Sequence, residues 1–241
     1  MYKKYYIFQT ILAISIITLS FSCATNTELT KTDEQKVEIQ EPEPQIETKI
    51  VPKEKSIKSE SYYLITDIVY PEFQDKALLN KIIENSILSY YKEFEKVSET
   101  DWNEMKNNDE NTPPFFYGTR YDFSCSKNFT SVLIKTEINS GGAHGNQVLQ
   151  SYNYNEKEKT IDSDITKLTG YTYDELSYLS RQELYKKLSG DKNWIDTGTE
   201  PYPHNFEIFL VDDKNVTIYF EPYTVASYAE GIQSVKLKLK K

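Results

Sequence analysis

The sequence predicts an α+β fold, with a mainly antiparallel sheet and two amphipathic helices. An apolar stripe with helical i, i+3, i+4, i+7 spacing runs through residues 78–94. Several short strand-like runs follow one another over residues 121–154 with no helical spacing between them, which favours antiparallel pairing. Thr172 and Glu175 form a Thr-x-x-Glu capping box, which predicts the start of a second helix.

The elements of the first half follow from these signals. A strand is expected from Tyr63 to Tyr70, ending at Pro71, and the first helix begins near Asp75. Its stripe comprises Leu78, Leu79, Ile82, Ile83, Ile87, Tyr90, Tyr91 and Phe94. A polar loop then covers residues 100–116. Three strands are expected over residues 121–125, 132–138 and 148–154, with a turn at 155–159.

The second half contributes one helix and three strands. The second helix extends from Thr172 to a stop at Gly190, a residue type common just past helix ends. Alternating residues Phe206, Ile208 and Leu210, then Val216, Ile218 and Phe220, flank a turn at 212–215 and predict a hairpin. The last strand alternates Val235, Leu237 and Leu239 with Lys236, Lys238 and Lys240, so one face is buried and the other is charged.

The N-terminus has the pattern of an export signal. Lys3 and Lys4 precede an apolar run over residues 5–21, so residues 1–22 are predicted to be a signal peptide. The end of this run resembles a bacterial lipobox, with Ser20 where leucine is usual, and Cys23 is the expected site of acylation, as in palmitate-bearing lipoproteins. The alternative is an uncleaved membrane helix, since about 20 apolar residues can span a bilayer. Either interpretation places the body of the protein outside the cytoplasm.

A disordered tether is expected over residues 23–60, because its dense charge and low hydrophobicity cannot offset the entropy of ordering. The single α+β domain is then expected over residues 61–241. Cys125 alternates with aromatic residues and is predicted to be a buried apolar side chain. A Cys23–Cys125 disulfide is the alternative if Cys23 carries no lipid.

The charge of the chain bears on its partners. The formal net charge is −9, which argues against nucleic acid as a ligand, because phosphate binding requires basic patches. An acidic surface instead suits a basic protein partner. The 20 tyrosines reflect either ligand-stacking surfaces or the codon bias of an AT-rich genome.

Sequence motifs give little support for catalysis. The chain has no phosphate-binding loop, dinucleotide fingerprint or Gly-x-Ser-x-Gly motif, and its two histidines and two cysteines lack zinc-site spacing. We therefore expect no catalytic residue, no metal and no cofactor. A pair of carboxylates acting on a glycosidic bond is the enzymatic alternative, because the separation of such a pair is not readable from sequence.

One short segment stands out as a candidate site. Residues 140–146 hold three of the eight glycines and His144, between two strand-like runs. Glycine pairs in such a place mark a tight bend or a close backbone approach. His144 either bonds backbone around the bend or contacts a ligand. We favour the structural role and expect replacement of His144 to impair folding before function.

Three segments together resemble a known family. They are Gly-Gly-Ala-His-Gly at 141–145, Tyr-Asn-Tyr-Asn at 152–155 and Phe-Glu-Pro-Tyr-Thr-Val-Ala-Ser-Tyr-Ala-Glu-Gly at 220–231. They resemble the extracytoplasmic domain of the RsiV-type anti-sigma factors, a domain also found beside polysaccharide deacetylase domains and in bacterial lipoproteins. The resemblance spans most of residues 62–239 and implies a receptor for lysozyme, whose binding exposes the protein to proteolysis. The candidate ligand-binding residues are Gly142, His144, Asn146, Tyr223 and Tyr228.

The chain departs from this family at its N-terminus, where only a few residues precede the apolar run. We therefore expect no sigma-binding region and no deacetylase catalytic domain. The expected function is a lipid-anchored envelope protein on the cell membrane or outer membrane, facing the periplasm or cell exterior. Its expected partner is lysozyme or a similar muramidase, which it would bind as a decoy, inhibitor or sensor head. The alternatives are a peptidoglycan-binding or other glycan-binding module, an enzyme acting on envelope polysaccharide, and a structural envelope protein.

Overall fold

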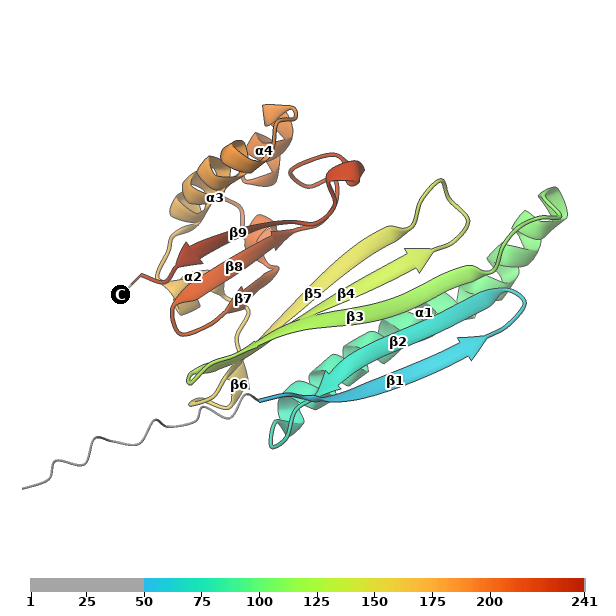
Figure 1. The fold of residues 1–241 in the computed structure, drawn as a ribbon, viewed down its shortest axis with the longest axis horizontal. Coiled ribbons are helices and arrows are strands. Elements are labelled where there is room, and N and C mark those ends of the chain that lie inside the picture. Colours follow the sequence, from blue (N-terminus) through green and yellow to red (C-terminus); the bar gives the residue numbers. More distant parts are fainter. Residues whose placement is uncertain (1–49, 241) are drawn as a thin grey trace, which may run out of the picture. The chain divides into compact units, whose positions relative to one another are not determined.

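A six-stranded sheet and a long helix form the first part of the fold (Figure 1). The computed structural model describes residues 50–240; the predicted signal peptide, Cys23 and most of the predicted tether lie outside them. The sheet has the order β1-β2-β3-β4-β5-β6. Its strands are β1 (Lys53–Glu60), β2 (Leu64–Glu72), β3 (Phe115–Cys125), β4 (Phe129–Asn139), β5 (Asn146–Asn155) and β6 (Thr160–Ile161), and helix α1 (Ala77–Asn108) connects β2 to β3.

A three-stranded antiparallel sheet and three short helices form the second part, in the order β7-β8-β9. Its elements are α2 (Ile165–Thr169), α3 (Tyr173–Lys187), α4 (Lys192–Gly198), β7 (Phe209–Val211), β8 (Asn215–Phe220) and β9 (Gln233–Lys238), with 3₁₀ turns at Pro203–Phe206 and Tyr228–Glu230. Both parts belong to one compact unit. The α+β prediction is confirmed, although the described residues form four α-helices and two sheets rather than two helices and one sheet.

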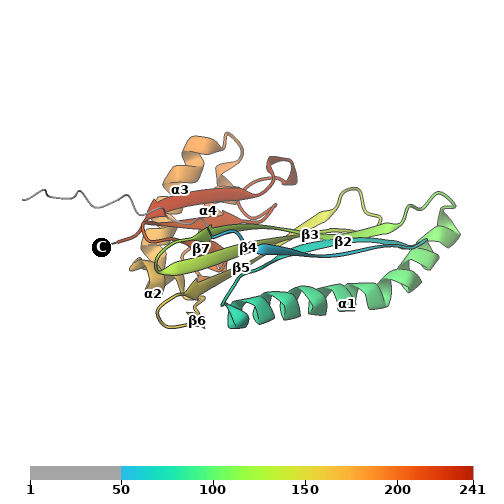
Figure 2. The same cartoon turned by 60° about the horizontal axis from the view of Figure 1, so that its bottom comes forward.

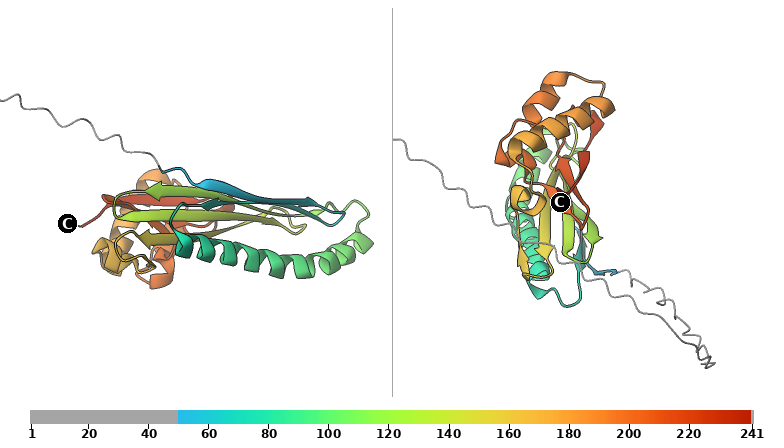
Figure 3. Two further views of the ribbon diagram at one scale, coloured as in Figure 1. Left: turned by 90° about the horizontal axis from the view of Figure 1, so that it is seen from below. Right: turned by 90° about the vertical axis from the view of Figure 1, so that its left-hand side faces the viewer.

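Helix α1 covers one face of the six-stranded sheet (Figures 2 and 3). Its buried residues Leu79, Ile83 and Ile87 pack in one core with alternate residues of β2, β3, β4 and β5. The helix extends to Asn108, so the polar loop predicted from residue 100 was wrong in its first half. Trp102 anchors this extension, because its ring is buried and its Nε1 donates to the Pro113 carbonyl at 2.9 Å. A single buried apolar side chain in two otherwise polar turns gives too weak a periodicity for the sequence to predict a helix there.

The pairing of β2 with β3 is parallel, while every other pairing in the described part of the chain is antiparallel. Parallel neighbours need a crossover connection, and α1 supplies it. The Thr119 hydroxyl extends this pairing beyond its last register pair, because its Oγ1 accepts from Val69 N at 3.0 Å and donates to Val69 O at 2.8 Å.

Strand β1 corrects the predicted boundary of the tether, because residues 53–60 pair antiparallel with β2 along their whole length. Lysine–carboxylate pairs link the two strands, at 3.2 Å for Lys55–Glu72 and 3.3 Å for Lys58–Asp67. Nearly all side chains of β1 are exposed, so the strand contributes backbone hydrogen bonds and no apolar pattern. Strand β2 in turn runs through Pro71, opposite Glu54, rather than stopping there.

The second core confirms the capping box and corrects two boundaries. The Glu175 amide donates to the Thr172 hydroxyl at 3.3 Å, and the Thr172 amide donates to the Glu175 carboxylate at 2.9 Å. Helix α3 ends at Lys187 rather than at Gly190, because Leu188 is already extended. Phe206 lies in a 3₁₀ turn rather than in the strand. The predicted 212–215 turn and the alternating last strand are both present.

Strand β7 lies against the sheet face opposite α1, where Leu210 packs on Leu133 and Leu149. Buried polar side chains of the large sheet hydrogen-bond to the β7 backbone. The Ser131 hydroxyl donates to Val211 O at 2.7 Å, and the Asn153 amide donates to Phe209 O at 2.9 Å. These hydrogen bonds satisfy backbone carbonyl groups of β7 and hold the three-stranded sheet against the six-stranded sheet.

Candidate functional site

Two loops far apart in sequence meet at the end of the two sheets. One is the β4–β5 turn (residues 140–145), and the other is the β8–β9 connection (residues 221–232). The His144 ring stacks on the Tyr228 ring with centroids 3.8 Å apart and planes at 19°. His144 Nε2 lies 3.1 Å from the Tyr223 hydroxyl, and the Tyr228 hydroxyl donates to Gly145 O at 2.7 Å. The structure therefore brings together three of the five predicted site residues.

The predicted hydrogen bond between His144 and the backbone of the bend is present, because Nδ1 lies 2.9 Å from Gly145 O. A proton on Nδ1 for that contact leaves Nε2 of the neutral ring free to accept from the Tyr223 hydroxyl. The ring is exposed, and its aromatic neighbours within residues 50–240 are Tyr223 and Tyr228. His144 therefore connects the β4–β5 turn to the β8–β9 connection at the surface and is not part of a hydrophobic core.

The remaining predicted residues, Gly142 and Asn146, are exposed in the same turn, and Asn146 begins β5. Among residues 50–240, neither of them has a hydrogen bond to the tyrosines. Gly141 instead shows why the turn needs glycine: its φ is +86°, and an added Cβ would lie 2.3 Å from the Cε atom of Met105. The turn therefore rests directly on the end of α1.

Tyr223 has an unusual backbone conformation for a large residue. Its φ is +71°, in the left-handed region that favours glycine, and its side chain is 52% exposed. Bulky residues adopt this region at a cost of about 1–3 kcal/mol, and such residues cluster at functional sites. The fold thus bears a conformational cost to present this ring to solvent.

Trp194 of α4 extends the group and was not predicted. Its ring centroid lies 5.9 Å from that of Tyr223. Helix α4 packs closely on the β8–β9 connection, because an added Cβ at Gly198 would lie 2.1 Å from Thr224 O. The available signal was the Asp191 N-cap three positions before one of only two tryptophans. We name His144, Trp194, Tyr223 and Tyr228 the aromatic cluster.

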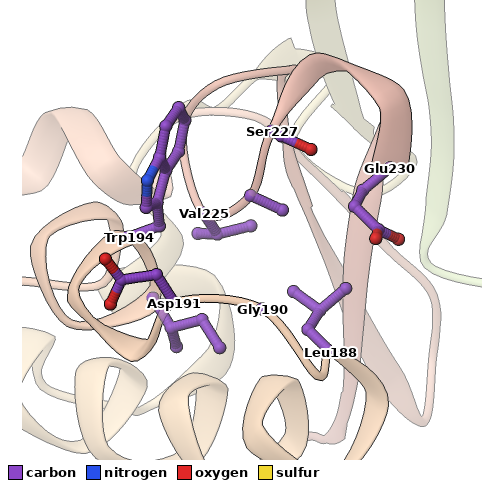
Figure 4. A pocket seen from close by; sticks show the side chains of 9 residues that line it. Leu188, Gly190, Asp191, Trp194, Val225, Ser227 and Glu230 are labelled. Carbon is purple, nitrogen blue, oxygen red and sulfur yellow. The ribbon is translucent and has the colours of Figure 1, made fainter.

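A hollow of 210 Å³ lies between α4 and the β8–β9 connection (Figure 4). Its lining comprises Leu188, Gly190, Asp191, Trp194, Ile195, Val225, Ala226, Ser227 and Glu230. A second, more open hollow of 350 Å³ is lined by Asp191, Asn193, Trp194, Thr197, Tyr223 and Thr224. Asp191 and Trp194 border both hollows, so the indole of the aromatic cluster lies between two concave surfaces.

The described residues form neither a metal site nor a membrane-spanning helix. Over residues 50–240, no three His, Cys, Asp or Glu side chains are grouped so as to hold a metal ion. In the same range, no helix has the length and apolar character needed to cross a membrane.

Comparison with known proteins assigns the chain to a family. The model of the family described as Deacetylase PdaC matches residues 11–147, which is more than half of the chain. The chain belongs to the PdaC family. A second model, described as a protein of unknown function (DUF3298), matches residues 163–240 of this PdaC family member. The two matched regions meet at the candidate site, because the β4–β5 turn lies in the first and the β8–β9 connection in the second.

One curated relative is the peptidoglycan-N-acetylmuramic acid deacetylase PdaC of Bacillus subtilis (strain 168). It is 26% identical over 176 residues, which cover 70% of this chain. The chain spans only about a third of that protein, 36% of its length.

Two solved structures are similar. A DUF3298 family protein from Pseudomonas aeruginosa PAO1 superposes with a TM-score of 0.54 at 15% identity, covering 78% of this chain and 91% of the other. A DUF3298 family member from Bacteroides fragilis NCTC 9343 gives a TM-score of 0.48 at 17% identity, with coverage of 78% and 91%. The first likeness supports the fold described above.

Proposed function

We propose that this protein is an envelope binding protein that holds lysozyme or a similar muramidase through the aromatic cluster. The observation that carries the proposal is Tyr223, exposed on a left-handed backbone and hydrogen-bonded to His144. Tyrosine and tryptophan supply large contact areas with little loss of side-chain entropy, and they dominate binding hot spots. A cluster of three such rings and the His144 imidazole, carried by two loops and α4, is typical of a recognition surface.

The charge of the chain supports a basic partner. The formal net charge is −9, and opposite surface potentials steer encounter and raise association rates. The resemblance to the RsiV-type extracytoplasmic domain points to the same partner. The anchor proposed at Cys23 would hold the domain on the cell membrane or outer membrane, facing the periplasm or exterior, where muramidases act.

The test is direct binding of the purified chain to lysozyme by calorimetry at two salt concentrations. We expect saturable binding that weakens as salt rises, and protection of cell walls from lysis. Tyr223→Ala should weaken binding at least tenfold. Tyr178→Ala, which alters a somewhat more exposed tyrosine on α3, should leave binding unchanged. Absence of saturable binding by the unmodified chain would refute the proposal.

A peptidoglycan strand is the second candidate ligand. It is favoured by the more open hollow beside Trp194 and Tyr223, since aromatic rings bordering a concave surface suit sugar rings. The name of the Bacillus subtilis relative gives it further support. Sedimentation with purified peptidoglycan, in the absence of any muramidase, separates this candidate from the first: a chain that sediments with the glycan and ignores lysozyme would be a glycan-binding module.

Both candidates describe binding without catalysis. To test this, the chain is incubated with peptidoglycan, and released acetate and new reducing ends are measured. We expect neither product above the blank. Production of either would instead support the enzymatic alternative, an activity on envelope polysaccharide.

A further inference from the structure

The hollow between α4 and the β8–β9 connection combines an apolar floor with charged walls. Ile195 and Val225 form the floor, each 1% exposed. Asp191 and Glu230 stand on opposite sides of the hollow, and the indole of Trp194 rises beside Asp191 (Figure 4). Across residues 50–240, neither of these carboxylates belongs to an ion pair. Two carboxylates without an ion-pair partner in this range therefore border an apolar hollow, and that of Asp191 also caps α4.

We infer that this hollow receives a lysine or arginine side chain from the basic protein that the chain binds. The inference rests on the proposed function and names the anchoring contact within it. The methylene stem of such a side chain would lie on Ile195 and Val225, as amphipathic side chains do on apolar surface. The cationic group would lie between the Asp191 and Glu230 carboxylates, and the indole face of Trp194 offers a cation–π contact.

A cationic side chain fits the lining better than a sugar does. A bound sugar ring needs hydrogen-bond partners for several hydroxyl groups, because unpaired polar groups are costly to bury. Among the lining side chains only those of Asp191, Trp194, Ser227 and Glu230 can form hydrogen bonds, and two of these four are anions. This combination matches one cationic head group on an apolar stem.

The contribution of each carboxylate can be removed without disturbing the fold. The Asp191 side chain caps α4 by accepting from the Asn193 amide at 2.9 Å, and asparagine caps helices as well as aspartate does. Asp191→Asn therefore removes the charge and keeps the cap. Glu230→Gln removes the second charge from an exposed residue. Glu93→Gln, on exposed surface of α1, is the control for the loss of one negative charge.

The experiment measures the affinity of the full chain and these variants for lysozyme and for an oligo-arginine peptide. We expect each single variant to bind both probes about tenfold more weakly, the double variant to lose more, and Glu93→Gln to change affinity less than twofold. The affinity of the double variant for both probes should also depend less on salt concentration than that of the unmodified chain. Thermal unfolding checks that all variants remain folded.

The outcomes separate the two proposals. If the unmodified chain binds the peptide but not lysozyme, and the double variant loses the peptide, the hollow is a cation site and lysozyme is the wrong partner. If the double variant binds both probes as Glu93→Gln does, the inference is overturned while lysozyme binding stands.

Discussion

Tyr223 and Gly198 show how single residues shape the candidate site. Tyr223 holds a left-handed backbone with an exposed ring. Gly198 lets α4 approach the Thr224 carbonyl more closely than any side chain would allow. One residue bears strain to present a side chain, and the other lacks a side chain so that two segments can touch. Each can be tested by a substitution that separates stability from binding.

Replacing Tyr223 by glycine should leave stability nearly unchanged and abolish binding. Glycine adopts φ near +71° without strain, which compensates for its greater entropy in the unfolded state, so the free energy of unfolding should shift by less than about 1 kcal/mol. The exposed ring contributes little to the core, and the proposed function assigns it to the binding surface. Chemical denaturation and lysozyme titration measure the two effects, and a variant that unfolds instead would show that Tyr223 is structural.

Replacing Gly198 by alanine should destabilise the second part of the fold. The new methyl group would lie 2.1 Å from Thr224 O, so α4 and the β8–β9 connection must move apart, at about 1–3 kcal/mol. Gly190→Ala is the matched control, because an added Cβ there has nothing within 4 Å. Urea unfolding of the two variants makes the comparison; equal stability would contradict the close approach.

Among the elements, β1 and the end of α1 contribute to the sheet without a sequence signal. Strand β1 has exposed side chains but covers the edge of β2 along eight residue pairs. The last turns of α1 are polar except where Trp102 enters the core. The structure shows their contributions: β1 pairs with the edge of β2, and Trp102 fixes the end of α1 to the segment before β3.

A chain that begins at residue 61 should therefore be less stable than one that begins at residue 48. Removal of β1 leaves the backbone groups of β2 unpaired along one edge, and exposed edges favour aggregation. Thermal unfolding and size-exclusion chromatography of the two chains measure the effect. Identical melting temperatures and monomeric elution of both would show that β1 is dispensable.

Across the whole molecule, carboxylates tie together segments that the sequence separates. Glu156 accepts from Lys76 Nζ at 2.5 Å and from the Thr130 hydroxyl at 2.6 Å, which links α1 to the end of β5. Asp213, in the β7–β8 turn, accepts from Ser126 and Asn128 in the β3–β4 turn, each at 3.0 Å. Burial acts to raise the pKa of both carboxyls, but these hydrogen bonds prevail and lower each pKa below its ordinary value, 4.5 for Glu156 and 3.8 for Asp213.

These shifts predict loss of stability in acid. Since each pKa is lower in the folded state, the unfolded chain binds more protons at acidic pH. The stabilisation that the two ionised carboxylates provide is therefore present above the unfolded pKa values and is lost as the pH falls below about 5. Calorimetry across pH 7 to 3 should show a falling melting temperature. Glu156→Gln should melt lower at pH 7, because buried Lys76 loses its partner, and should lose less on acidification. If the melting temperature of Glu156→Gln fell with pH as steeply as that of the unmodified chain, Glu156 would not contribute to the acid sensitivity.

The sequence by itself determined the α+β class, the α3 capping box, the 212–215 turn and the alternating last strand, because these depend on local periodicity and capping. A resemblance of motifs also predicted Gly142, His144, Asn146, Tyr223 and Tyr228 as ligand-binding residues, and the structure brings His144, Tyr223 and Tyr228 together. Only the tertiary structure decided that β2 and β3 are parallel, that residues 53–60 form a strand, and that Trp194 joins the site. Those features depend on contacts between distant segments: a crossover helix, an edge strand held by backbone hydrogen bonds and lysine–carboxylate pairs, and a glycine that lets α4 touch the β8–β9 connection.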